Sequence, residues 1–120
     1  MTILLFSRDL LASSSLTGAA QASGHSLESI ASLEALVKRL EQANVQLIVV
    51  DLAAPGCDIG AIVQSAHAVV ENPPTVIAFG PHVHKDRLEA ATQAGCDEVL
   101  SRGQFFRTPS EIFRRHVGEE

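Results

Sequence analysis

The sequence predicts an α/β domain in three layers, with helices on both sides of a mostly parallel sheet. Short apolar runs rich in β-branched residues alternate along the chain with segments of helical periodicity. Each connection between successive runs is long enough to form a right-handed strand–helix–strand unit. The chain has 120 residues, the usual size of one domain, so we expect a single domain over residues 1–120.

Five segments have the character of strands. The clearest is Val45–Val50, whose apolar, β-branched side chains are typical of a strand buried on both faces. A weaker pattern at residues 25–30, with few large apolar side chains, predicts a half-exposed edge strand. The remaining strands are expected at residues 2–6, 75–79 and 97–101.

Helices are expected between these strands. The clearest begins at Ser32, a favourable N-cap, and carries apolar side chains at helical spacing up to Asn44. In the first helix we expect Leu10, Leu11 and Leu16 to face inward. The other helices are predicted at residues 10–22, 59–70, 84–94 and 109–117.

Composition and charge exclude several classes of function. The net charge is −5 with histidine neutral, and the basic residues are scattered, so no clustered surface for nucleic acid is expected. No apolar run approaches the roughly 20 residues of a membrane span, and we expect a cytoplasmic protein. The two cysteines, Cys57 and Cys96, are too few for a disulfide framework and should lie at opposite ends of the sheet.

The strongest candidate for a functional residue is Asp51, which ends the central strand. A carboxylate there is costly deep in an apolar layer, so the strand should reach the surface at this point. Open α/β sheets place their sites at the carboxyl ends of such strands. The plain alternative is that Asp51 only ends the strand.

Two segments resemble the receiver domain of bacterial response regulators: VQLIVVDLAAPGCDIG, residues 45–60, and RLEAATQAGCDEVLSRGQF, residues 87–105. The resemblance covers nearly the whole chain. It implies a flavodoxin-like (βα)5 fold with parallel strand order 2-1-3-4-5. The switch point would then lie between the first and third strands, where this class of sheet binds ligands.

The resemblance also implies five site positions, of which this chain keeps few. The phosphoacceptor carboxylate falls on Asp51, a match. The two acids that hold Mg²⁺ fall on Ser7 and Arg8, and neither matches. Asp9 is acidic, but it stands one position late and is expected to begin the first helix.

The other two positions of the implied site are also changed. The switch hydroxyl falls on Gly80, which has none. The lysine that follows the family's fifth strand falls on Arg102, which keeps the charge with a different geometry. Because they follow the first, third and fifth strands, Arg8, Asp51 and Arg102 should converge at one edge of the sheet, with Arg8 paired to Asp51.

These losses decide which function we expect. Phosphoryl transfer to a carboxylate needs a divalent cation, and Mg²⁺ prefers carboxylate oxygens, of which Asp51 alone would remain. We therefore expect a stand-alone, degenerate receiver-like signalling domain with no cofactor and no catalytic activity, acting on a protein partner such as a sensor kinase or effector. One alternative is a genuine receiver phosphorylated on Asp51 with Mg²⁺. Another is a small-molecule-binding or catalytic flavodoxin-like protein that uses the same edge.

Two further groups of residues, histidines and phenylalanines, are candidates for a functional role. His82 and His84 could supply two metal ligands, but two are not a site, so solvated loop histidines are favoured. Phe105, Phe106 and Phe113 cluster in a chain poor in aromatics, either as core or as an exposed patch, with core favoured. In the resembled family the fourth helix, fifth strand and fifth helix often form a dimer face, so we expect a weak homodimer there.

Overall fold

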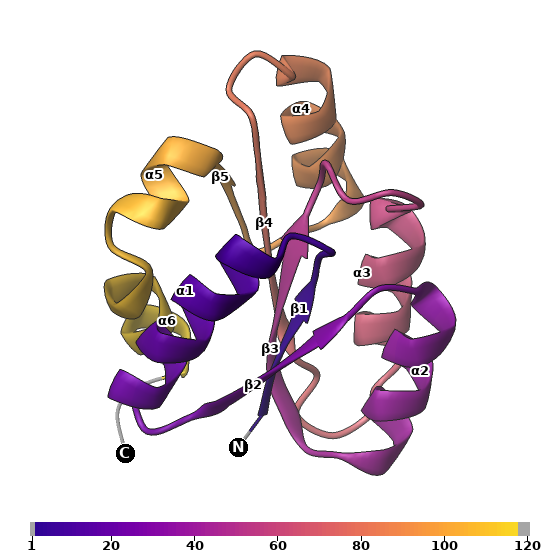
Figure 1. Ribbon diagram of the computed structural model, residues 1–120. Helices are drawn as coiled ribbons and strands as arrows, with labels where there is room; N and C mark the ends of the chain where they lie inside the picture. Colours follow the sequence, from indigo (N-terminus) through magenta and orange to yellow (C-terminus); the bar gives the residue numbers. More distant parts are fainter. Residues whose placement is uncertain (1, 118–120) are drawn as a thin grey trace.

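The computed structural model describes residues 2–117, which form one parallel five-stranded sheet between two layers of helices (Figure 1). The strand order is β2-β1-β3-β4-β5, so the predicted order 2-1-3-4-5 and the α/β fold class are confirmed. The strands are β1 (Thr2–Phe6), β2 (Ser26–Ile30), β3 (Val45–Asp51), β4 (Thr75–Gly80) and β5 (Glu98–Ser101). The helices are α1 (Leu10–Ala22), α2 (Leu33–Gln42), α3 (Ile59–His67), α4 (Lys85–Ala94), α5 (Arg102–Arg107) and α6 (Pro109–Val117).

The central strand β3 supplies both cores because successive side chains of a strand point to opposite faces. Ile48 and Val50 face the side covered by α2, α3 and α4. Leu47 and Val49 face the side covered by α1, α5 and α6 (Figure 1). No helix within residues 2–117 is long and apolar enough to cross a lipid bilayer.

The inward face of α1 differs from the prediction. Leu10 and Leu11 are 83% and 84% exposed, and the buried stripe is instead Ala12, Leu16 and Ala20. These three residues are four apart, so they lie on one side of the helix, whereas Leu10 and Leu11 point away from it. The expectation that both leucines face inward is therefore wrong.

The helix after β3 is shorter than predicted. It ends at His67 rather than at residue 70, and Val70 is 94% exposed. The backbone turns at Asn72, which has φ +51°, before the two prolines that precede β4. The left-handed Asn72 and the prolines after it cannot belong to a helix. The last turn of α3 has already closed at Ala68, whose N–H donates to the Gln64 carbonyl.

An additional helix, α5, follows β5 directly. A capping box holds its first turn: the Ser101 hydroxyl accepts from the Gln104 N–H, and the Gln104 side chain accepts from the Ser101 N–H. The helix turns Phe105 fully into the core, where its ring stacks on Phe79 at 4.7 Å between centroids, and Phe106 is half-buried against the same cluster. The favoured core assignment of these aromatic residues is confirmed.

Candidate functional site

Asp51 lies at the carboxyl end of β3, where the sequence places it, but its carboxylate is not open to solvent. The residue is only 5% exposed. Its Oδ1 accepts a hydrogen bond from the Ala53 N–H at 3.0 Å, and its Oδ2 accepts one from the Ser7 hydroxyl at 3.0 Å. A buried carboxylate needs such donors, and here both of its oxygens have one.

Ser7 reaches Asp51 because β1 and β3 are parallel neighbours. Phe6 is in register with Val50, so the residues that follow them, Ser7 and Asp51, arrive at the same edge of the sheet. Ser7 is 5% exposed; its hydroxyl donates to Asp51 and accepts the Asp9 N–H at 3.1 Å. Ser7, which stands where the resembled family has an acid, is therefore the side-chain donor to the buried carboxylate.

Asp9 serves the start of α1. Its Oδ1 accepts from the N–H groups of Leu11 and Ala12, and its Oδ2 accepts from Arg102 at 2.8 Å. The Ala12 N–H, followed by the Arg102 guanidinium, holds the pKa of Asp9 below its usual value. The expectation that Asp9 begins the first helix is confirmed, and both of its oxygens are engaged.

Arg102 is directed toward α1 and is packed on aromatic rings. Its guanidinium carbon lies 4.9 Å from the centre of the Phe106 ring and 5.7 Å from that of Phe79. With the ion pair to Asp9, these contacts link the start of α5 to the start of α1. Within residues 2–117, Arg102 forms no ion pair with Asp51.

Arg8 does not lie against Asp51 as the sequence predicts. The residue is exposed, and in the described part of the chain it makes no ion pair or hydrogen bond with Asp51. Successive side chains of an extended segment point to opposite sides, so the inward position of Ser7 turns Arg8 outward. The expected pairing of Arg8 with Asp51 is therefore not formed.

Gly80, at the position of the implied switch hydroxyl, is buried at the end of β4. A β-carbon added there would lie 3.3 Å from the Leu52 Cβ and 3.7 Å from the Leu88 Cδ2. Leu52 is itself buried, and its N–H donates to the Phe79 carbonyl at 2.9 Å. A side chain at Gly80 would require Leu52 to shift slightly, so the glycine leaves the space that the buried leucine fills.

The donors at this edge do not fit a magnesium ion. Mg²⁺ requires near-octahedral oxygen coordination, usually with one or two carboxylates and several waters. Each carboxylate oxygen of Asp51 and Asp9 already accepts at least one hydrogen bond, so a metal ion would have to compete with these donors. Ser7 offers only a neutral hydroxyl that is itself hydrogen-bonded. Among the described residues, no three His, Cys, Asp or Glu side chains gather where they could hold one ion. This also applies to His82 and His84, which both lie just before the start of α4.

No protein-family model matches the sequence, and no curated protein matches it. Solved structures do. The receiver domain of a sensor histidine kinase from Pseudomonas aeruginosa, with magnesium coordinated in its active-site cleft, matches with a TM-score of 0.78, 20% identity and 98% of each chain covered. The signal receiver domain of a response regulator from Bermanella marisrubri matches with a TM-score of 0.81, 17% identity and 97% of each chain covered.

A third match is the beryllofluoride-activated NtrC4 receiver domain, a dimer in solution, with a TM-score of 0.75 and 19% identity. It covers 97% of this chain and 98% of that one. All three neighbours have receiver domains, and the likeness extends over nearly the whole length of each. This chain therefore has the flavodoxin-like fold of response regulator receiver domains.

Proposed function

We propose that this chain is a receiver-fold signalling domain that acts through contacts with a protein partner and without Mg²⁺-dependent phosphorylation. The partner would be a sensor kinase or an effector, met in the cytoplasm, and the chain itself would not be a catalyst. The observation that supports this proposal is the hydrogen bond from the buried Ser7 hydroxyl to Asp51, at the position where the resembled family has a metal-holding acid.

The chemistry of phosphoryl transfer explains why this bond matters. A carboxylate nucleophile must present a free oxygen to the phosphorus in line with the leaving group. Both oxygens of Asp51 accept hydrogen bonds, from Ser7 and from Ala53, and the residue is 5% exposed. The charge that develops in the reaction also needs a cation to neutralise it. The cationic group that follows β5, Arg102, already pairs with Asp9.

The proposal is tested by incubating the protein with Mg²⁺ and acetyl phosphate and measuring its intact mass. We expect no added phosphoryl group on the wild-type chain. A single added group that disappears in the Asp51→Asn variant would overturn the proposal. That result would instead support the alternative of a true phosphoacceptor, which the position of Asp51 at the carboxyl end of β3 favours.

A weak homodimer through α4, β5 and the helices that follow is a finer part of the proposal. The NtrC4 receiver domain is dimeric, but in this chain Phe105 is fully buried, so such a face would be mainly polar. Sedimentation over a concentration series measures whether the chain forms a dimer. A strictly monomeric protein at about 100 μM, well above the micromolar constants of many weak contacts, would contradict the dimer.

A further inference from the structure

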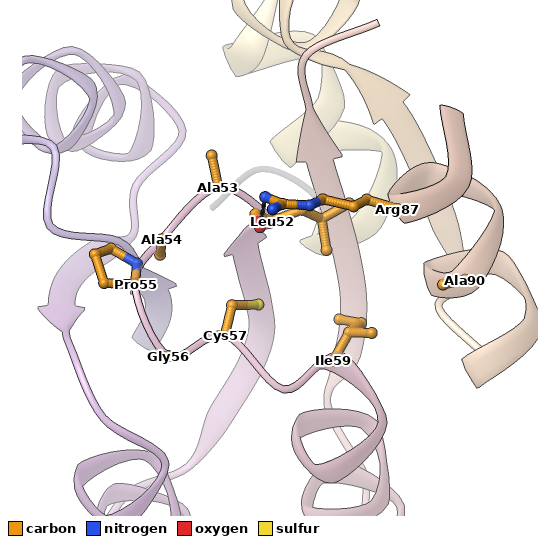
Figure 2. Close-up of a pocket in the computed structure, with 9 residues that line it drawn as sticks. All are labelled: Leu52, Ala53, Ala54, Pro55, Gly56, Cys57, Ile59, Arg87 and Ala90. Atoms are coloured by element: carbon orange, nitrogen blue, oxygen red, sulfur yellow. Dashed lines mark hydrogen bonds between the residues drawn. The ribbon is translucent and has the colours of Figure 1, made fainter. Parts of the chain in front are cut away.

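A cavity of about 420 Å³ lies between helix α4 and the loop that leaves β3 (Figure 2). Its volume falls in the range of roughly 300–1,000 Å³ that is typical of small-molecule sites. The loop residues 52–57 form one wall, Ile59 of α3 lies below, and Arg87 and Ala90 of α4 form the other wall. Most of this lining is small or apolar, and among the residues that the structure describes Arg87 is the only charged side chain in it.

Arg87 reaches from α4 across the cavity to the loop (Figure 2). Its Nη1 donates to the Leu52 carbonyl at 3.5 Å, at the outer limit of a hydrogen bond. Within residues 2–117 it has no carboxylate partner. A guanidinium carries five N–H donors in a planar fork that suits a carboxylate, and this long bond is easily exchanged for a better one.

The loop itself offers few donors for a larger anion. The Ala53 N–H donates to the Asp51 carboxylate, the Ala54 N–H to the Asp51 carbonyl, and the Cys57 N–H to the Ala54 carbonyl. These amides are therefore not free to form the backbone cradle that binds phosphate groups. Arg87 is left as the principal anion-binding group of the cavity.

The charges near the loop also disfavour a multiply charged ligand. Burial raises the pKa of the Cys57 thiol to about 11, and the negative charges of Asp51 and Asp58 contribute to the increase. The thiol is consequently neutral at physiological pH and forms part of the uncharged wall. A ligand with one negative charge and an apolar body fits these surroundings better than a phosphate.

We propose that this cavity binds a small organic monocarboxylate, with its carboxylate paired to Arg87 and its apolar body against Ile59 and the loop. Such a ligand would link α4 to the loop that follows Asp51. It would therefore act on the same edge of the sheet as Asp51, but through different side chains. Leu52 transmits the change, because its carbonyl is the present partner of Arg87 and its side chain packs over Gly80. This inference does not depend on whether Asp51 is phosphorylated, since Asp51 does not line the cavity.

The test is a titration of the full, ¹⁵N-labelled chain with hexanoate, followed by amide chemical shifts. We expect saturable shifts centred on residues 52–59 and 87–90. Arg87→Gln and the replacement of hexanoate by uncharged hexanamide should each weaken binding about tenfold or more, as expected for loss of a charge-assisted hydrogen bond. Lys85→Gln makes the same charge change on the same helix but outside the cavity, and should bind as the wild type does.

A second variant tests the cavity independently of charge. Ala90 is exposed on α4, so Ala90→Leu should fold normally while filling the space and should abolish the shifts. The proposal is overturned if hexanoate causes no saturable shift, or if hexanamide or inorganic phosphate binds as well as hexanoate. It is also overturned if Arg87→Gln and Ala90→Leu retain wild-type affinity.

Discussion

Replacing Ser7 by alanine tests whether the hydroxyl supports the buried carboxylate. The variant removes the 3.0 Å hydrogen bond to Asp51 and leaves Oδ2 of a 5% exposed side chain without its donor. Hydrogen bonds to charged groups contribute roughly 1.5–3 kcal/mol, so the free energy of unfolding should fall by about 2 kcal/mol. For a domain of this size that corresponds to a decrease in Tm of about 8 °C.

Urea and thermal unfolding, each followed by circular dichroism, measure this change. Ser15→Ala is the matched control, because Ser15 is exposed on α1 and alanine favours the helix, so its stability should stay the same or rise slightly. In the Asp51→Asn background, Ser7→Ala should lower the free energy of unfolding by only about half as much, since a neutral acceptor forms a weaker hydrogen bond. A cost below about 0.5 kcal/mol, the usual range of neutral surface changes, would refute the reasoning.

Three other predictions concern groups around the two cores. Arg102→Gln should lower the free energy of unfolding by about 0.5–1 kcal/mol, measured in urea, because the guanidinium loses its contact with the face of Phe106. Burial raises the pKa of Glu98, but the hydrogen bond from His116 and the nearby arginine outweigh it, so the pKa lies below its usual 4.5. Glu98 therefore contributes stability above pH 4.5 that is lost as the pH falls through its lowered pKa, and Glu98→Gln should flatten the acid limb of a Tm–pH profile. Alkylation of Cys57 by iodoacetamide at pH 8, mapped by mass spectrometry, should be about tenfold slower in the folded than in the unfolded chain. Burial raises the pKa of the thiol from 9.0 to about 11, which lowers its thiolate fraction, although the more basic thiolate is also more nucleophilic; equal rates would contradict this.

The sheet could be predicted from the sequence because each buried strand must be apolar on both faces. The predicted run from Val45 to Val50 has this property, and the observed strand, Val45–Asp51, extends it by one residue. Helix α5 was missed although its signal is present: Ser101 and Gln104 have the spacing of a capping box. Gly103 between them lowers helix propensity, so a six-residue helix depends on that cap and on Phe105 entering the core.

The site was predictable in position but not in its contacts. Parallel strands bring their following residues to one edge, which places Ser7 near Asp51. The direction of the side chain that follows β1 determines whether Ser7 or Arg8 turns inward. The sequence alone favours Arg8, because a guanidinium attracts a carboxylate strongly. Burial decides the outcome, because a small hydroxyl satisfies a buried carboxylate without desolvating a guanidinium. The fit of Leu52 over Gly80 arises between residues far apart in sequence and has no local signal.

Two substitutions beside Asp51 should create a magnesium site. In the double variant Ser7→Asp with Arg8→Asp, a new carboxylate would replace the hydroxyl that now contacts Asp51. Two carboxylates so close do not both ionise without a cation, so the variant should be less stable than the wild type in EDTA. If the variant binds Mg²⁺ with a dissociation constant of about 1 mM, 10 mM Mg²⁺ should raise its free energy of unfolding by about 1.4 kcal/mol and its Tm by about 5 °C. The wild type should show no such rise in Tm with Mg²⁺. The single variant Arg8→Asp should not show it either, because Arg8 is exposed and the Ser7 hydroxyl would still donate to Asp51. A comparable rise in the Tm of the wild type with Mg²⁺ would show that its own donors hold the ion, and the argument from the Ser7–Asp51 bond would fail.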